Sequence, residues 1–164
     1  GSLAKVGPIR THADTVARVI RSPQTAVHFV TTLEEMPVQE TLDGIADLSE
    51  LTGGAIRPGG IFINMARPAM LDDADLAAAA SGTLDAADVA LGLKDAGIAD
   101  NHGLAADLMA ELREHALQVA LQNRERDELL TSGRPHYELP MIPEGIDLAS
   151  LYQLAAALRE QGAA

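Results

Sequence analysis

The sequence has 164 residues, of which 47% are apolar and only 2% aromatic, so one ordinary domain with an aliphatic core is expected. Twenty-four acidic residues against 12 basic ones give a net charge of −12, and no basic stripe appears, which argues against nucleic acid as a partner. The absence of cysteine excludes disulfides, thiolate chemistry and cysteine zinc sites. No apolar run is long enough for a membrane span and no signal-peptide pattern is present, so we expect a cytoplasmic protein.

The chain begins with a predicted helix and a predicted strand. Thr11 is expected to cap the helix, whose apolar side carries Val16, Val19 and Ile20. Residues 26–33, AVHFVTTL, are nearly all apolar or β-branched, which is typical of a strand covered on both faces. His28 lies inside this run, so we expect it in the core.

A second helix and a second strand follow. Pro37 suits the first turn of a helix, and Gly53 with Gly54 is expected to end it. Its apolar positions recur at helical spacing: Val38, Leu42, Ile45 and Leu48. The apolar run at 61–63 in GGIFINMARP then predicts a buried strand that closes on Asn64.

The middle of the chain predicts helices only. Residues 69–100 contain two short alanine-rich helices separated by Ser81-Gly82, with Asp72, Asp73 and Asp75 as capping acids rather than a cation site. Residues 104–130 form a long helix. Its apolar stripe is expected at Leu104, Leu108, Leu112, Ala116 and Val119, and its solvated face at Glu111, Glu114, Gln118, Gln122 and Glu125.

The last elements are a strand at 137–142 and a helix capped by Asp147, with Leu151, Leu154 and Leu158 inside. Long helical connections between apolar strands imply parallel pairing. The predicted fold class is therefore α/β, a parallel sheet covered by helices. We treat residues 1–164 as a single domain with a helical segment at about 69–132.

Polar or turn residues follow two of the strands, where open parallel sheets bind ligands. These are Asn64 and the segment LPMIPEG, 139–145. The alternative for Asn64 is an asparagine that ties down a turn, and Pro140 and Pro143 could likewise be turn residues. The sequence contains no G-x-x-x-x-G-K-S/T, G-x-G-x-x-G, G-x-S-x-G or H-E-x-x-H motif, so no catalytic residue and no metal ligand is assigned.

Four segments, in this order and spacing, resemble the carboxyl-terminal half of the ArsA-type anion-transporting ATPases. They are FVTTLEEMPVQET, GGIFINMARP, NRERDELL and ELPMIPEGIDLASL. That family includes the arsenite-pump ATPase and the ATPase that targets tail-anchored membrane proteins. The resemblance spans about residues 10 to 160, and it implies part of a P-loop NTPase-like domain that binds ATP with Mg²⁺ and works as a homo- or heterodimer of ArsA-like subunits.

The resemblance also implies site residues. Asn64 would hydrogen-bond the adenine, because its amide offers a donor and an acceptor side by side. Backbone groups of Pro140, Met141 and Ile142 would close over the base, and Glu34 falls where the family often has an acidic residue. Some members join two subunits through zinc at a Cys-x-x-Cys pair. The cysteine-free stretch 69–103 excludes that bridge and argues against the tail-anchor-targeting role.

The phosphate loop and both switch segments of the family lie upstream of the part that this chain resembles. We therefore expect this chain to be the adenine-side half of a larger ATPase, inactive alone, whose ATP hydrolysis acts on a partner or a transported anion. One alternative is a non-catalytic partner subunit or binding module of the same fold. Another is a structural α/β fragment without a ligand.

Overall fold

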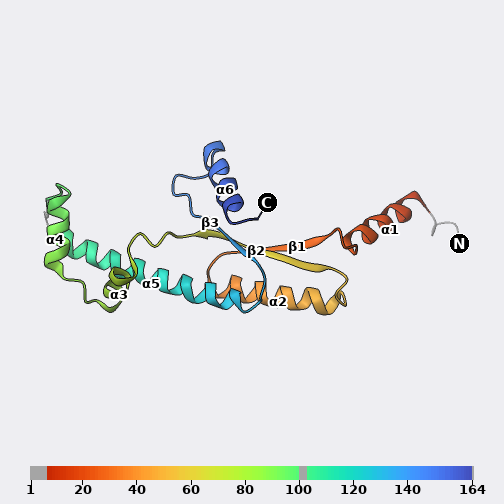
Figure 1. The fold of residues 1–164 in the computed structure, drawn as a ribbon, viewed down its shortest axis with the longest axis horizontal. Helices are drawn as coiled ribbons and strands as arrows, with labels where there is room; N and C mark the ends of the chain where they lie inside the picture. Colours follow the sequence, from red (N-terminus) through yellow and green to blue (C-terminus); the bar gives the residue numbers. More distant parts are fainter. Residues whose placement is uncertain (1–6, 100–102, 164) are drawn as a thin grey trace. The chain divides into compact units, whose positions relative to one another are not determined.

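The computed structural model describes residues 7–99 and 103–163, and in that part the chain forms three parallel strands and six helices, as the predicted α/β class requires (Figure 1). Every expected element is present. In chain order they are α1 (Pro8–Ile20), β1 (Ala26–Thr31), α2 (Glu35–Leu51), β2 (Arg57–Ala66), α3 (Asp73–Ser81), α4 (Ala86–Asp95), α5 (Leu104–Leu130), β3 (His136–Pro140) and α6 (Leu148–Glu160).

The chain divides into two compact units. One unit contains the sheet and comprises the residues up to Ala66 together with those from Asp127 onward. The other unit is Arg67–Arg126, which holds α3, α4 and most of α5. The candidate residues Glu34, Asn64 and 140–142 all belong to the sheet unit.

The sheet has the strand order β1-β2-β3, and both pairs are parallel. Helix α2 connects β1 to β2, and the segment that carries α3, α4 and α5 connects β2 to β3. Parallel pairing requires such long connections, because the chain must return to the starting end of the sheet before the next strand begins.

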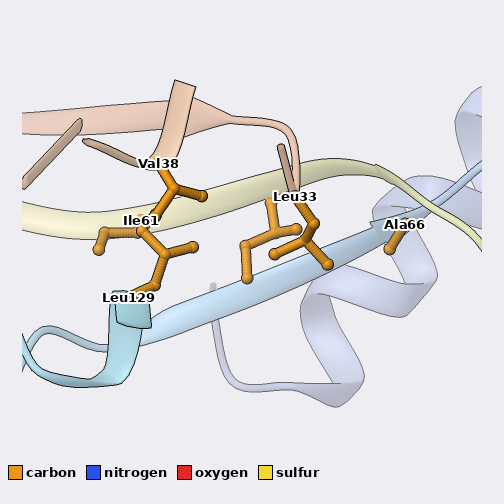
Figure 2. Packing of buried hydrophobic residues seen from close by; sticks show 6 residues of the cluster. Leu33, Val38, Ile61, Ala66 and Leu129 are labelled. Atoms are coloured by element: carbon orange, nitrogen blue, oxygen red, sulfur yellow. The ribbon is translucent and has the colours of Figure 1, made fainter. Parts of the chain in front are cut away.

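One face of the sheet carries the hydrophobic core. Ile61 and Ile63, two residues apart in β2, are both completely buried, as period-two alternation predicts for a face packed against helices. Figure 2 shows Val38 of α2 and Leu129 of α5 turned toward Ile61, beside Leu33. Leu42 and Ile45 of α2 pack against the same cluster, so the predicted apolar side of this helix is confirmed.

The opposite face is more open than predicted. Val30 in β1 is 69% exposed and His28 is exposed too, so the expectation of a strand covered on both faces, with His28 in the core, is wrong. Instead, the rings of His28, Phe62 and Tyr137 follow one another across the three strands, with centroid separations of 5.5 and 5.3 Å. An apolar, β-branched run shows strand propensity, but it does not reveal whether both faces are covered.

Gly59 and Gly60 lie inside β2 and make room for these rings. A Cβ atom on Gly59 would come within 2.7 Å of the His28 ring, and one on Gly60 within 2.9 Å of the Tyr137 ring. The Gly60 N–H donates a hydrogen bond to His28 Nδ1 at 3.0 Å. The double glycine therefore lets an aromatic row lie close to the backbone.

Three details of the helices differ from the sequence analysis. Helix α1 begins at Pro8, so Thr11 lies inside the helix and does not cap it. In α6, Asp147 is the N-cap as predicted, but Leu151 is 52% exposed. In α5, Gln122 and Glu125 are buried rather than solvated. The Gln122 carboxamide accepts the Arg67 N–H at 3.0 Å, and Glu125 pairs with Arg124 at 3.1 Å.

The helices of the second unit begin and end as their sequence predicts. The Asp72 carboxylate accepts the Asp75 N–H and caps α3, which confirms the capping interpretation, and Gly82 ends this helix with a φ of 72°. Asp85 caps α4 in the same way. These acids satisfy backbone donors at positive helix ends, where carboxylates are favoured.

Candidate functional site

The carboxyl ends of the three strands lie along one edge of the sheet, because all three strands are parallel and adjacent. This topology brings three predicted positions to the same edge: Glu34 after β1, Asn64 near the end of β2, and residues 140–142 at the end of β3. Open parallel sheets bind ligands beyond this edge. The candidate functional site is therefore this carboxyl edge.

Asn64 lies on the face opposite the core. Because Ile61 and Ile63 point into the core, alternation along the strand turns Phe62 and Asn64 to the other side. The Asn64 side chain is half-buried, and no hydrogen bond holds its carboxamide among residues 7–99 and 103–163. An asparagine that tied down a turn would use this amide within the chain, so the observed geometry does not favour that alternative.

Asn64 and Met65 form a β-bulge. The pairing of β2 with β3 shifts between Ile63 and Ala66: three residue steps on β2 match two on β3. Within this bulge Met65 has a φ of 55°, the left-handed region that non-glycine residues rarely adopt. The Met141 N–H donates to the Ala66 carbonyl at 2.9 Å and closes the bulge on the β3 side.

Sequence reasoning did not identify Met65. The usual signals of a bulge or of a left-handed residue are glycine or asparagine, and methionine is neither. The only trace in the sequence is a break in period: after Ile61 and Ile63 the next buried side chain is Ala66, three positions on, while Met65 is 53% exposed.

The segment after β3 offers only some of its backbone groups to a ligand. The Met141 N–H is engaged by Ala66, and the Ile142 carbonyl accepts the Gly145 N–H at 3.2 Å. Pro140 has no N–H to donate. The Met141 carbonyl and the Ile142 N–H have no backbone partner in the described part of the chain, so they form one acceptor and one donor. Pro140 is exposed, whereas Met141 and Ile142 are half-buried.

A cavity of about 360 Å³ lies beside this segment, between Ile142 and the first turn of α6. Its acidic lining residues are Glu144 and Asp147. The Asp147 carboxylate accepts the Ser150 N–H at 2.7 Å, and the Ser150 hydroxyl accepts the Asp147 N–H at 2.7 Å, which is a capping box. The Ser150 N–H is the main cause of the lowered pKa of Asp147. A carboxylate that stays ionised makes this cavity unfavourable for phosphate.

Glu34 is the N-cap residue of α2, but its side chain does not cap the helix. Its carboxylate accepts a hydrogen bond from the Thr32 hydroxyl at 3.0 Å, so Thr32, a residue the sequence analysis did not single out, fixes its position after β1. Glu34 is exposed, and its carboxylate has room to accept a further hydrogen bond from a polar ligand group.

Within 7–99 and 103–163, no group of three or more His, Asp or Glu side chains could hold a metal ion. In the same residues, no helix combines the length and the apolar character needed to cross a bilayer.

Comparison with known proteins gives similarity over nearly the whole chain. No known protein-family profile matches the sequence. ATPase BagA of Mycobacterium tuberculosis is 38% identical over 160 residues, which is 98% of this chain and 46% of that protein. "Putative ATPase Mb3704" of Mycobacterium bovis shows the same identity and the same coverage. This chain therefore spans about half the length of the curated relatives it matches, and those relatives carry the name ATPase.

Proposed function

We propose that this chain forms the adenine-binding part of an ATP-binding and ATP-hydrolysing protein of the ArsA type. The observation that carries the proposal is Asn64, a half-buried carboxamide without a hydrogen-bond partner among the described residues, at the carboxyl edge of a parallel sheet. A carboxamide complements the N6/N7 edge of adenine, where a donor and an acceptor stand side by side. The names of the relatives support ATP as the nucleotide.

The other groups at this edge suit a base better than a phosphate. The Met141 carbonyl and the Ile142 N–H supply an acceptor and a donor, and Pro140 presents an apolar ring beside them. Glu144 and Asp147 add negative charge to the neighbouring cavity, which would repel phosphate oxygens but can accept hydrogen bonds from ribose hydroxyls. In this proposal Glu34 is a further acceptor at the edge.

Phosphoryl transfer needs a phosphate cradle, Mg²⁺ ligands and a positioned water. The present sequence has no phosphate loop. Since the matched relatives are about twice as long, we propose that other residues of a longer protein bind the phosphates and Mg²⁺. Hydrolysis would then rearrange a homo- or heterodimer of ArsA-like subunits that acts on a partner or a transported anion.

Two measurements test this function. The longer protein should bind ATP in a calorimetric titration and release phosphate, whereas the 164-residue chain alone should release none above a no-protein control. ATP binding without hydrolysis by the longer protein would identify a non-catalytic partner subunit instead. No nucleotide binding at all would contradict the proposal, and phosphate release by purified 164-residue chain would show that the other half is not essential.

The dimer is tested separately. Light scattering of the longer protein, with and without ATP, should give a mass of two ArsA-like subunits in at least one state. A monomer mass in both states, at concentrations well above the nucleotide dissociation constant, would contradict this part of the proposal.

A further inference from the structure

The β-bulge at the end of β2 changes which side chains leave the core. In a regular strand the core positions after Ile61 and Ile63 would continue with Met65. Instead Ala66 is buried, at 7% exposure, and Met65 is 53% exposed. Alternation already turns the Asn64 carboxamide away from the core, and the bulge adds the thioether of Met65 beside it at the carboxyl edge.

This conformation is imposed by the residues on either side. Ile63 is fixed in the core at one end, and Ala66 at the other, where its carbonyl also accepts the Met141 N–H. Ile63 pairs with Glu138 and Ala66 with Pro140, so β2 has two residues between its paired positions where β3 has only one. A left-handed φ costs free energy in a residue with a Cβ, so it persists only where the surroundings demand it.

The chemistry of the two exposed groups is complementary. A carboxamide recognises the polar edge of a purine, and a thioether makes favourable contacts with an aromatic ring. On the basis of the proposed function, we infer that Met65 is a positioning and base-contact residue: its left-handed conformation maintains the bulge that fixes the backbone next to Asn64, and its side chain covers the adenine ring. Neither role requires Met65 to touch the phosphates.

Met70 provides a matched control. It is also a methionine with positive φ, 58°, and its side chain is 83% exposed. It belongs to the other compact unit, at the centre of a tight turn in which the Leu71 N–H donates to the Ala69 carbonyl at 2.7 Å. Met65→Val and Met70→Val thus place the same β-branched residue at two positions with a similar positive φ.

The experiment titrates the longer protein with ATP and, in parallel, with inorganic tripolyphosphate, which carries phosphates without a base. Met65→Val should weaken the binding of ATP about tenfold and leave the affinity for tripolyphosphate unchanged. Met70→Val should change neither affinity. Met65→Asn, which tolerates the left-handed region but lacks the thioether, should recover part of the lost ATP affinity.

Four results would overturn the inference. Equal ATP affinities for Met65→Val and Met70→Val would make the bulge a purely structural feature. Loss of both ligands in Met65→Val would indicate general disruption, and a thermal melt would show it. If Asn64→Ala weakens ATP and Met65→Val does not, only the inference fails. If the wild type does not bind ATP, the proposed function fails and this inference with it.

Discussion

The two faces of the three-stranded sheet are built for different purposes. On one face Ile61 and Ile63 are completely buried against α2 and the end of α5. On the other, Val30 is 69% exposed, and the rings of His28, Phe62 and Tyr137 form a row that is only partly covered. The first face holds the unit together, whereas the second leads to Asn64 and the candidate site.

The comparison shows how one strand can serve both purposes. Alternation along β2 sends Ile61 and Ile63 to the core and Phe62 and Asn64 to the opposite side. The packed face can thus fix the backbone without using the polar group at its end. Substitutions on the two faces should therefore affect different measurements, stability for one and ligand binding for the other.

The largest effect is expected in the core. Ile61→Ala removes a fully buried side chain and leaves a cavity, so the free energy of unfolding should fall by about 2–5 kcal/mol. Val30→Ala on the open face should change it by less than about 0.5 kcal/mol. Urea denaturation of both variants measures the difference. Similar losses in the two variants would mean that the open face is packed in solution.

A smaller effect is expected from Gly60→Ala. The new Cβ would lie 2.9 Å from the Tyr137 ring and 3.1 Å from the Pro135 carbonyl oxygen, and the backbone atom cannot move aside easily. The variant should lose about 1–3 kcal/mol of unfolding free energy. Gly92→Ala in α4, where a Cβ meets nothing within 4 Å, is the control and should be neutral or stabilising. An unchanged unfolding free energy in Gly60→Ala would contradict the close packing of the Tyr137 ring against the backbone.

Helix α1 adds a second open apolar surface to the sheet unit. Ile9, Val16 and Ile20 are 86%, 51% and 46% exposed, and such surfaces promote association. The 164-residue chain should self-associate, and Val16→Gln should shift its mass toward the monomer in light scattering. Arg18→Gln on the same helix is the control. A wild-type monomer at high concentration would contradict this prediction.

The smallest effect concerns pH and the α6 cap. The pKa of Asp147 is lowered from its ordinary value of 3.8, chiefly by the Ser150 N–H. A lowered folded-state pKa stabilises the fold above the unfolded value, and this stabilisation is lost as the pH falls through the folded value. The stability advantage of wild type over Asp147→Ala should therefore be constant at neutral pH and shrink below about pH 3.8. A stability difference between wild type and Asp147→Ala that is independent of pH would mean that the carboxylate is not the capping group.

The sequence was sufficient to predict the structural features that depend on a local pattern of residues. The amphipathic side of α2, the bounds of α5 and the Asp147 cap follow from spacing and end signals within a few residues. The same reasoning located Asn64 near the end of β2, although the strand does not close on Asn64 as expected and continues through the bulge to Ala66. These are properties of short segments.

Features that depend on distant residues could not be predicted. The burial of Gln122 requires the Arg67 N–H, 55 positions earlier in the chain. The bulge at Met65 arises from a register mismatch with β3, which lies about 70 residues later and is not visible in the local sequence. The openness of the second sheet face depends on what packs against it, and strand propensity carries no such information.

The central claim is that the Asn64 carboxamide recognises adenine, and nucleotide titration of the longer protein tests it most directly. Asn64→Ala should weaken the binding of ATP by about 1–3 kcal/mol, because the base edge is left unpaired. It should weaken the binding of GTP less, since guanine presents a different edge. Asn123→Ala, an exposed asparagine on α5, is the matched control. An unchanged ATP affinity with an intact thermal melt would contradict the claim, and equal losses for ATP and GTP would show that Asn64 supports the site without reading the base.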